Sequence, residues 1–430
     1  MSGRARRIWS VLAGLVVLGL VVILAILLWP VPRAEAVAAP AASPQLVARG
    51  AYIATAADCV ACHTVEGGQP YAGGRAFRLP FGTLYAPNIT PDRETGIGAW
   101  TDGEFVRAVR HGVGREGEQL YPAFPYTSYA RMPEDEILAV KAYLFSLPPV
   151  RSEVRENGLA FPFNQRPLMR FWKILFLRGG AFEPAPQQTA EWNRGAYLVN
   201  VLGHCGECHT PRNLAFGYFR NTLSGETMQG WTAWNITSDP RHGIGAWSAD
   251  ELVSYFRTGY APGRAVASGP MKEAVDFSLA KLTDGDLRAM AVYLKSKPAS
   301  DQGPVPNQGA GRLARASLMA PPPGEEASEG RRIFEGACAS CHAWNGAGQQ
   351  TPLAALAGRR AVAAPDGANV VQTILRGGSI NAPQGHAFMP AFARAYSDAE
   401  IAAVANYVVE HFGGVDGEVG PRDVARARRD

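Results

Sequence analysis

Three copies of one five-residue pattern, Cys-x-x-Cys-His, constrain the possible folds of this sequence more than any other feature. The copies read "CVACH", "CGECH" and "CASCH". They contain all six cysteines of the 430-residue chain, so none is left over for a disulfide. The chain must therefore build three compact sites of one kind. Their residues are Cys59, Cys62 and His63, Cys205, Cys208 and His209, and Cys338, Cys341 and His342.

Three kinds of chemistry use closely spaced cysteines. A structural zinc site needs four ligands, commonly from two such pairs, and three separate pairs fit this poorly. A thioredoxin-like dithiol favours a βαβ setting, whereas the surrounding segments have helical periodicity. Cys-x-x-Cys-His is typical of c-type haem attachment. Two thiols on one helical turn add to the porphyrin vinyl groups, and the adjacent histidine supplies the proximal nitrogen. We therefore expect three covalently bound haem c groups.

The sixth ligand of each iron separates electron transfer from catalysis. A methionine thioether closes the iron and raises its potential, whereas an open position would bind oxygen or peroxide. In the third copy Met389 lies in "HAFMPAF", and in the second copy Met271 lies in "SGPMKEA". Both methionines precede a helical pattern and are flanked by Gly or Pro, which favours a loop over a helical stripe. We predict that both are iron ligands.

The first copy lacks a methionine at the matching place. Counting back from Ile137, the first apolar anchor of the next helical pattern, reaches Phe124, which cannot bind iron. Met132 lies only five residues before Ile137 and is the predicted ligand. His111 and an open iron are the alternatives.

Longer segments repeat around the motifs. "RGAYIATAADCVACHT" matches "RGAYLVNVLGHCGECHT", and "NITPDRETGIGAW" matches "NITSDPRHGIGAW". The third copy lacks the second block and should be smaller. Each copy ends in an amphipathic pattern with acids in its first turn, which predicts helices over 134–147, 284–296 and 398–412. Small residues in the helices before each motif, Gly50, Gly195 and Gly330, would let a second helix cross closely.

The first 35 residues predict a membrane segment. Three arginines in "MSGRARR" precede an uncharged run from Ile8 to Trp29. About 20 apolar residues span a bilayer as a helix, and N-terminal arginines keep that end cytoplasmic. Retention as an anchor is the favoured interpretation. Cleavage as a signal within "AEAVAAPAAS" is the alternative.

Composition sets wider bounds. A hydrophobic content of 47%, a charged content of 19% and a net charge of +4 describe a globular protein and give no case for nucleic-acid binding. The run "RFWKILFL" favours core or interdomain packing over membrane contact. His204 is expected to be a polar neighbour of its motif, whereas His242, His386 and His411 are expected at the surface. Trp100 and Trp247 are expected to line haem walls.

At this point the sequence resembles the membrane-associated triheme cytochrome c subunits of periplasmic alcohol, gluconate, sorbitol, fructose and aldehyde dehydrogenases. The resemblance covers about residues 45–412. It rests on the three haem motifs and on "NITPD", "TGIGAW", "RHGV", "LYPAFPY", "GHCGECHTPRN" and "GPM". Many members of that family have Tyr-Pro-Ala-Met-Pro-Tyr where this chain has Phe124. The polar C-terminal tail also departs from members that use C-terminal segments at the membrane.

The resemblance implies a mainly α fold, with three tandem class I cytochrome c domains behind an N-terminal transmembrane helix. The expected division is an anchor or signal over 1–33, domain 1 over 46–150, a connector over 151–187, and domain 2 over 188–298. A Pro/Gly-rich linker over 299–325, domain 3 over 326–414 and a polar tail over 415–430 complete it. We refer below to the segments 46–150, 188–298 and 326–414 as repeats 1, 2 and 3.

The resemblance also implies a function. A periplasmic dehydrogenase subunit oxidises its substrate, and the three haems relay electrons to ubiquinone or a terminal oxidase. The chain would sit in the inner membrane with its haem domains in the periplasm. No flavin, pyrroloquinoline quinone or molybdenum motif is recognisable, so the chain is expected to be an electron-transfer subunit and not the catalytic one. The rival interpretations are a cytochrome c subunit of a terminal oxidase and a haem peroxidase acting at haem 1.

Overall fold

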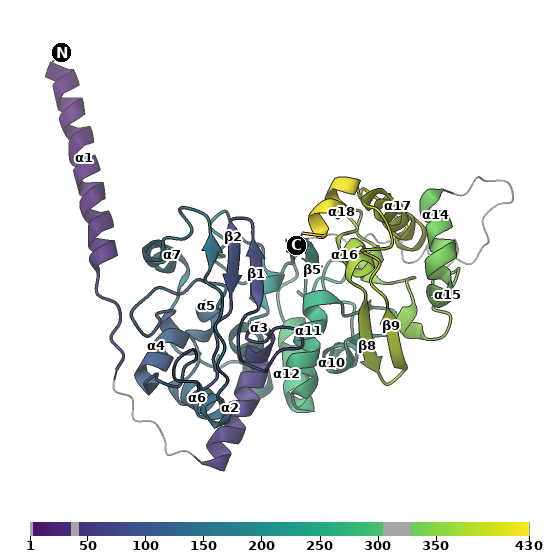
Figure 1. Cartoon of the computed structure of the whole chain (residues 1–430), viewed down its shortest axis with the longest axis horizontal. Coiled ribbons are helices and arrows are strands. Elements are labelled where there is room, and N and C mark those ends of the chain that lie inside the picture. The colour runs from purple at the N-terminus through teal and green to yellow at the C-terminus, as the bar shows by residue number, and fades with distance from the viewer. Residues whose placement is uncertain (1–2, 36–42, 304–327, 430) are drawn as a thin grey trace. The chain divides into compact units, whose positions relative to one another are not determined.

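The computed structural model describes residues 3–35, 43–303 and 328–429. The chain divides into two compact units. Unit one comprises Met1–Ala51 and Val65–Phe182, and unit two comprises Tyr52–Thr64 and Glu183–Asp430. As predicted, helices are the main elements, and the sheets of the described residues are small and antiparallel (Figure 1).

Unit one holds most of repeat 1. Its main helices are α1 (Gly3–Leu28), α4 (Asp102–His111), α6 (Glu134–Ser146) and α7 (Met169–Phe176), with a short α5 (Tyr126–Tyr129). Helix α2 (Pro44–Ala56) begins in this unit and ends in unit two. Strands β1 (Ala76–Leu79), β2 (Gly82–Tyr85) and β3 (Gly158–Leu159) form one sheet, in which Ala76 pairs with Tyr85 and Gly82 pairs with Leu159.

Unit two holds the first haem motif together with repeats 2 and 3. Repeat 2 contains α8 (Ala190–Tyr197), α10 (Ala249–Thr258), α11 (Gly269–Phe277) and α12 (Asp284–Lys295). It also contains the hairpins β4–β5 (Glu226–Met228, Trp231–Ala233) and β6–β7 (Tyr260–Ala261, Ala265–Val266). Repeat 3 contains α14 (Glu329–Ile333), α16 (Ala368–Arg376), α17 (Asp398–Val408) and the hairpin β8–β9 (Gly378–Ala382, Gly385–Met389).

A close helix crossing recurs in all three repeats, at the glycines that the sequence singled out. A Cβ atom built on Gly50 would lie 1.8 Å from the carbonyl oxygen of Ala139 in α6. The same atom on Gly195 would lie 1.9 Å from the carbonyl oxygen of Ala289, and on Gly330 2.1 Å from that of Ala403. Any side chain there would push the paired helices apart, so the three crossings share one geometry.

The C-terminal helix of each repeat forms close to its predicted position. Helices α6, α12 and α17 cover the predicted segments, and Thr283 and Ser397 cap α12 and α17 by accepting from the backbone N–H three residues on. The predicted capping box between Ser397 and Glu400 is present. One difference is the end of α17, where the backbone continues as a π-helical turn, η7 (Val409–Gly413), instead of as α-helix.

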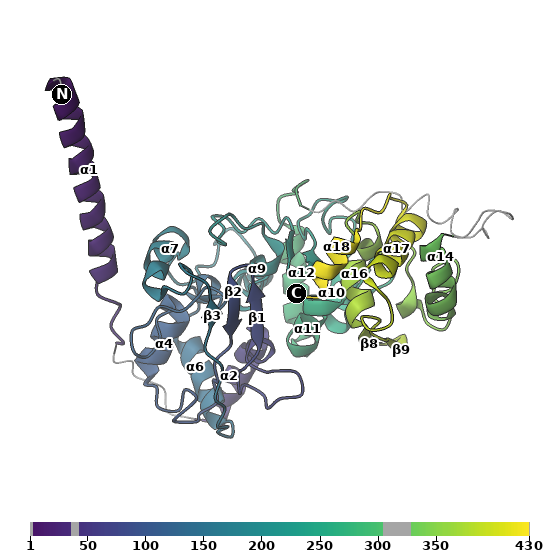
Figure 2. The same cartoon turned by 45° about the horizontal axis from the view of Figure 1, so that its top comes forward.

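The segment 415–430 differs from the expected polar tail. It forms α18 (Pro421–Ala427), which packs with α16 and α17 (Figures 1 and 2). Val419 and Val424 are buried in the core of repeat 3, and Arg428 binds Asp398 through its Nε at 2.5 Å. The sequence missed this helix because its apolar residues are few. The predicted linker over 299–325 lies mostly outside the described residues.

Helix α7, in the connector, has two different faces. Trp172 packs edge-on against Tyr126 with their ring centroids 6.1 Å apart, and Phe176 is buried. On the other face Ile174 is 64% exposed and Leu175 is 54% exposed. The predicted packing role therefore holds for one face only. Arg170 of α7 also donates hydrogen bonds to the backbone carbonyls of Ile26 and Trp29, at the C-terminal end of α1.

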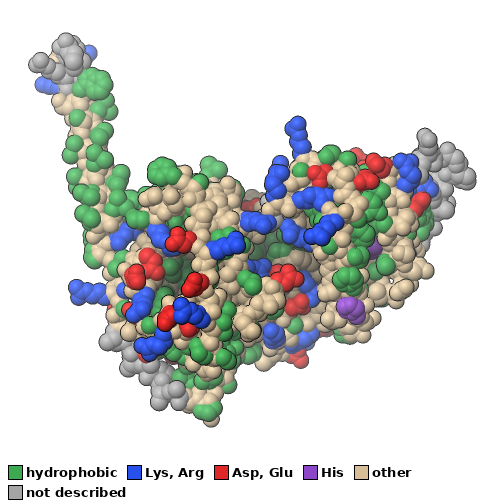
Figure 3. Space-filling model, viewed as in Figure 1, with side chains coloured by type: hydrophobic (Ala, Val, Ile, Leu, Met, Phe, Trp, Pro, Cys, Tyr) green, Lys and Arg blue, Asp and Glu red, His purple; other side chains and the backbone are tan. Residues whose placement is uncertain are grey.

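Helix α1 is long and apolar enough to cross a membrane. The stretch Arg7–Leu28 spans 22 residues with a mean hydropathy of 3.3, and none of it is buried. Figure 3 shows its surface covered by hydrophobic side chains. The possible cleavage segment that follows lies largely outside the described residues.

Candidate haem sites

Each Cys-x-x-Cys-His motif lies on one short helical turn. Cys59–Cys62 form α3, with His63 as its C-cap. Helices α9 (Gly206–His209) and α15 (Ala339–His342) begin directly after Cys205 and Cys338. Residues three and four apart on a helix are neighbours, so both thiols and the histidine of a motif share one small surface. None of the six thiols is in a disulfide.

Burial acts on the first thiol of motifs 1 and 2. Burial, with Asp58 and Cys62 adding to it, raises the pKa of Cys59 to about 12. Burial, with Cys208 adding to it, raises the pKa of Cys205 to about 12. The thiolate is the redox nucleophile, so the raised pKa of these two thiols disfavours a redox role for them. Within the described part of the chain, no three His, Cys, Asp or Glu side chains are grouped to hold a metal ion.

The histidines of motifs 2 and 3 are oriented as proximal ligands need to be. Nδ1 of His209 lies 2.6 Å from the carbonyl oxygen of Trp234, and Nδ1 of His342 lies 2.6 Å from that of Ala354. A carbonyl can only accept, so Nδ1 carries the proton and the Nε2 lone pair is available to a metal.

The repeated "NIT" block explains the placement of that carbonyl in repeat 2. The side chain of Asn235 donates to the carbonyls of Ser300 and Gln302, and its Oδ1 accepts from Thr237 Oγ1 at 2.7 Å. In repeat 1 Asn88 makes the same kind of bond to Val150 and accepts from Thr90 at 2.8 Å. All four side chains are buried. The block therefore fixes the residue before the Asn, which in repeat 2 is Trp234.

Buried polar atoms around motif 3 fit a large ligand with carboxylates. The Nε1 of Trp344, the hydroxyl of Tyr407 and the Nε2 of His411 are shielded from solvent, and no described residue hydrogen-bonds to them. The three side chains are neighbours, with His411 stacked on Tyr407 at 5.1 Å between centroids and 6.0 Å from Trp344. Buried polar groups are normally paired, so the residues present fit a haem, whose two carboxylates can accept.

The structure places Met271 and Met389 differently from the predicted loops. Met271 lies in the first turn of α11, and Met389 is the last residue of β9, paired with Gly378. Both are partly buried, and Met389 packs against the core of repeat 3. Their role as iron ligands stays a prediction.

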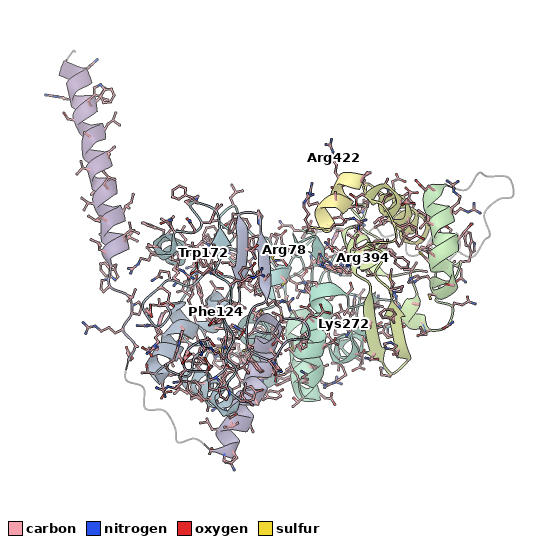
Figure 4. All side chains as sticks on the ribbon, viewed as in Figure 1. Arg78, Phe124, Trp172, Lys272, Arg394 and Arg422 are labelled. Carbon is pink, nitrogen blue, oxygen red and sulfur yellow. The ribbon has the colours of Figure 1, made fainter. Side chains whose placement is uncertain are left out.

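Two matching backbone hydrogen bonds identify the residue of repeat 1 that corresponds to Met271 of repeat 2. Leu120 N–H donates to the carbonyl of Gly112 at 2.7 Å, and Ala267 N–H donates to that of Gly259 at the same distance. Four residues after each donor lie Phe124 and Met271. Phe124, labelled in Figure 4, therefore occupies the methionine position of repeat 1.

The same comparison assigns a core position to Met132. It lies five residues before Ile137, as Leu282 lies five before Leu287, and both Met132 and Leu282 are 3% exposed. His111, the alternative ligand, is exposed at the last turn of α4. Met132 as the ligand of haem 1 stays a prediction, but its correspondence with a core leucine argues against it.

Motifs 1 and 2 lie beside each other within unit two. His204 hydrogen-bonds to the backbone of Ala57, and the charge of Asp58 acts on the Cys208 thiol. Nearby, the Tyr52 hydroxyl donates to Asp286 Oδ2 at 2.5 Å. His204 is thus the polar neighbour that the sequence predicted, but it contacts motif 1 as well as its own motif.

Two of the three histidines expected at the surface are in fact partly enclosed. His242 is paired with Asp239 at 3.1 Å with each side chain 16% exposed, and His411 is stacked on Tyr407. His386 is exposed as predicted. Trp247 is buried, and the carbonyls of Trp100 and Trp247 accept hydrogen bonds from Lys141 and Lys295.

Sequence reasoning missed the arginine pair Arg359 and Arg360, which extends from repeat 3 to repeat 2. Arg359 lies over the Tyr260 ring at 4.9 Å, and Arg360 lies over the Trp234 ring at 5.0 Å. No local signal marks them, since arginines are frequent in the chain and the partners of this pair lie about 100 residues away.

Comparisons with known proteins show which family the chain resembles. The cytochrome c family matches residues 47–148 and 327–411. The chain is 42% identical over 376 residues to a subunit of nicotinate dehydrogenase from Pseudomonas putida. The match covers 86% of this chain but only 30% of that longer protein.

Two further relatives match over most of their length. Identity to the gluconate 2-dehydrogenase cytochrome c subunit of Pantoea cypripedii is 38% over 405 residues, covering 90% of this chain and 91% of the relative. Identity to the fructose dehydrogenase cytochrome subunit of Gluconobacter japonicus is 37% over 401 residues, covering 89% and 82%.

Proposed function

This chain belongs to the family of the cytochrome c subunits of gluconate and fructose dehydrogenases, and from that premise we propose that it is a triheme electron relay. It would take electrons from a periplasmic dehydrogenase subunit and pass them to ubiquinone or to a terminal oxidase. The substrate class of the partner is an alcohol, sugar, sugar acid or aldehyde.

The observation that carries this proposal is the contact between neighbouring motifs. Motifs 1 and 2 meet through Ala57 and His204, and electrons cross only short gaps between centres. Repeat 3 in turn packs on repeat 2, because Asn369 pairs with the backbone of Thr232 at 2.8 and 3.1 Å. Tyr260, Leu353 and Ile380 form an apolar cluster shared by the two repeats. Such contacts suit a chain of electron carriers.

We assign the site residues as follows. The six motif cysteines would hold three haem c groups by thioether bonds, and His63, His209 and His342 would be the proximal ligands. Met271 and Met389 would close haems 2 and 3. Met132 is retained as the candidate at haem 1, although its register matches that of a core leucine. Each bound haem supplies a one-electron iron couple, which is the only chemistry the relay needs.

The protein's own residues orient and shield these groups. The carbonyls of Trp234 and Ala354 hold two of the histidines in one tautomer. Helix α1 would anchor the chain in the inner membrane with the haem-bearing units on the periplasmic side.

Purification in mild detergent tests the proposal. We expect the chain to co-purify with a dehydrogenase subunit, to carry the mass of three haems after denaturation, and to be reduced when the dehydrogenase substrate is added. Co-purification with a copper–haem oxidase and no dehydrogenase would instead identify an oxidase subunit. A denatured mass without added haem would refute both.

Phe124 gives one reason to test a second function, a haem peroxidase acting at haem 1. If no thioether closes that iron, one haem in three should bind carbon monoxide when reduced. Peroxide turnover at a rate that depends on this haem would support the enzyme. Carbon monoxide binding without turnover would leave the relay as the function.

A further inference from the structure

We propose that Arg360, a residue of repeat 3, binds a carboxylate of the haem held by repeat 2. The guanidinium thereby sets the potential of that haem. The inference rests on the proposed function, because it takes a haem at motif 2 as given. It adds a cofactor-binding residue that lies 151 positions after the proximal histidine of that haem.

The guanidinium of Arg360 lies in the immediate surroundings of motif 2. It stacks over the ring of Trp234 at 5.0 Å, and the carbonyl of this same tryptophan accepts from His209. Its Nη1 approaches the carbonyls of Asn235 at 3.4 Å and Gly243 at 3.3 Å.

One end of the guanidinium has no acceptor. The Nη2 of Arg360 is shielded from solvent, and no residue in the described part of the chain accepts a hydrogen bond from it. Burial also lowers the pKa of Arg360 to about 10, with Tyr255 and Asp239 acting in the opposite direction. A shielded N–H group without an acceptor is costly, so an acceptor for Nη2 is to be expected here.

The nearby protein groups do not supply that partner. Asp239, the carboxylate whose charge acts on Arg360, accepts from the backbone N–H groups of Arg241 and His242 and from the His242 ring. The buried phenol of Tyr255 has a pKa raised by burial and stays neutral. A haem brings two carboxylates into such a site, and a planar guanidinium is well matched to a carboxylate.

Arg359 provides a matched comparison. It belongs to the same turn and also extends from repeat 3 to repeat 2, but its donors are used on backbone carbonyls. Its Nη2 donates to Pro352 at 2.8 Å and its Nη1 to Ala261 at 3.3 Å. It lies over the ring of Tyr260, whereas Arg360 lies over that of Trp234. Substituting Arg359 therefore perturbs packing between the repeats and removes a neighbouring positive charge whose donors already have acceptors.

The test is a redox titration of the full-length protein in detergent, followed by visible absorbance. In Arg360→Met, loss of the positive charge favours the ferric state. We expect the ratio of reduced to oxidised haem to fall about tenfold at a fixed ambient potential, equivalent to about 59 mV for a one-electron couple. The shift should fall on the transitions of the neighbouring haems 1 and 2, and the transition of haem 3 should stay in place.

Two further variants make the result specific. Arg360→Lys keeps the charge but loses the fork geometry, so its shift should be in the same direction and smaller. Arg359→Met should leave all three transitions in place. Unchanged potentials in Arg360→Met, or equal shifts in Arg359→Met and Arg360→Met, would overturn the inference.

The proposed function fails in a different way. Haem content and dehydrogenase co-purification are measured on the same preparations. Three haems, a bound dehydrogenase and unchanged potentials would refute the role of Arg360 alone. Fewer than three haems in the unaltered protein would refute the triheme relay itself.

Discussion

At the scale of single residues, the position of Phe124 has the most direct consequence. Phe124 corresponds to Met271, so replacing Phe124 with methionine should add a thioether ligand to haem 1. In Phe124→Met we expect a gain in the near-infrared sulfur–iron band and a loss of carbon monoxide binding. Met132→Leu, which mimics Leu282, should leave the band unchanged. A band that weakens in Met132→Leu would show that Met132 is the ligand after all.

Asp286 joins the helix before motif 1 to repeat 2 through Tyr52 and Arg194. Its Oδ1 and Oδ2 accept from Arg194 at 2.8 and 2.7 Å. Partial burial works to raise the pKa of Asp286, but the hydrogen bonds from Arg194 and Tyr52 outweigh it, so the pKa is lowered. A lowered pKa means that this contribution to stability is present at neutral pH and is lost as the pH falls through the lowered pKa.

Asp286→Asn should therefore lower the thermal unfolding midpoint at pH 7 by about 2 °C or more. The difference from the unaltered protein should shrink as the pH falls below the ordinary aspartate range, where both forms are neutral. Thermal melts followed by circular dichroism at several pH values would measure it. A difference that stays constant with pH would mean that packing, and not charge, is responsible.

Residues close together in sequence were the predictable part of the site. The cysteines and histidines of each motif are local, so spacing alone identifies them. The carbonyl of Trp234 and the guanidinium of Arg360 reach motif 2 only through tertiary contacts, and no local pattern marks them. Phe124 was found by counting back from the next helix, but its correspondence with Met271 rests on the matching hydrogen bonds to Gly112 and Gly259.

At the scale of elements, the crossing between α8 and α12 offers a sharp test. A Cβ on Gly195 would lie 1.9 Å from the carbonyl oxygen of Ala289. Because that oxygen belongs to the backbone of a helix, it cannot move aside as a flexible side chain would. Gly195→Ala should destabilise the protein by about 1–3 kcal/mol or more through overpacking. Denaturant unfolding would measure it. Gly285→Ala is the control, because a Cβ there meets only the Thr283 hydroxyl at 3.9 Å.

Elements with a strong apolar period were predictable, and those that depend on context were not. Helices α6, α12 and α17 follow their periodicity and caps. The π-helical turns η2 (Leu198–Leu202), η4 (Phe334–Cys338) and η7 have no sequence signature, since each results from one extra residue in a continuous helix. Helix α18 forms because Val419 and Val424 find a place in the core of repeat 3.

At the scale of the whole molecule, α1 should decide where the protein is found. A variant lacking residues 1–33, exported by a cleavable signal, should appear in the soluble fraction with its haem content unchanged. Fractionation and the mass of the denatured protein would show this. Recovery in the membrane fraction would implicate another surface, and the exposed Ile174 and Leu175 of α7 would be the first to examine.

The sequence predicted the recurring helix crossings and the long apolar helix α1, but not how the repeats join. Motif 1 falls in the same compact unit as repeats 2 and 3, apart from most of repeat 1. This arrangement follows from long-range contacts such as that of Tyr52 with Asp286. Matching repeated segments in the sequence cannot predict it, because the match does not say which segments are in contact.

The neighbouring position of motifs 1 and 2 has one more consequence. Haems held at these two motifs would not accept charge independently, because an electron on one would oppose the addition of an electron to the other. Their joint titration should be anticooperative, broader than the sum of two Nernst curves. The fitted midpoints then describe the pair and not either centre alone.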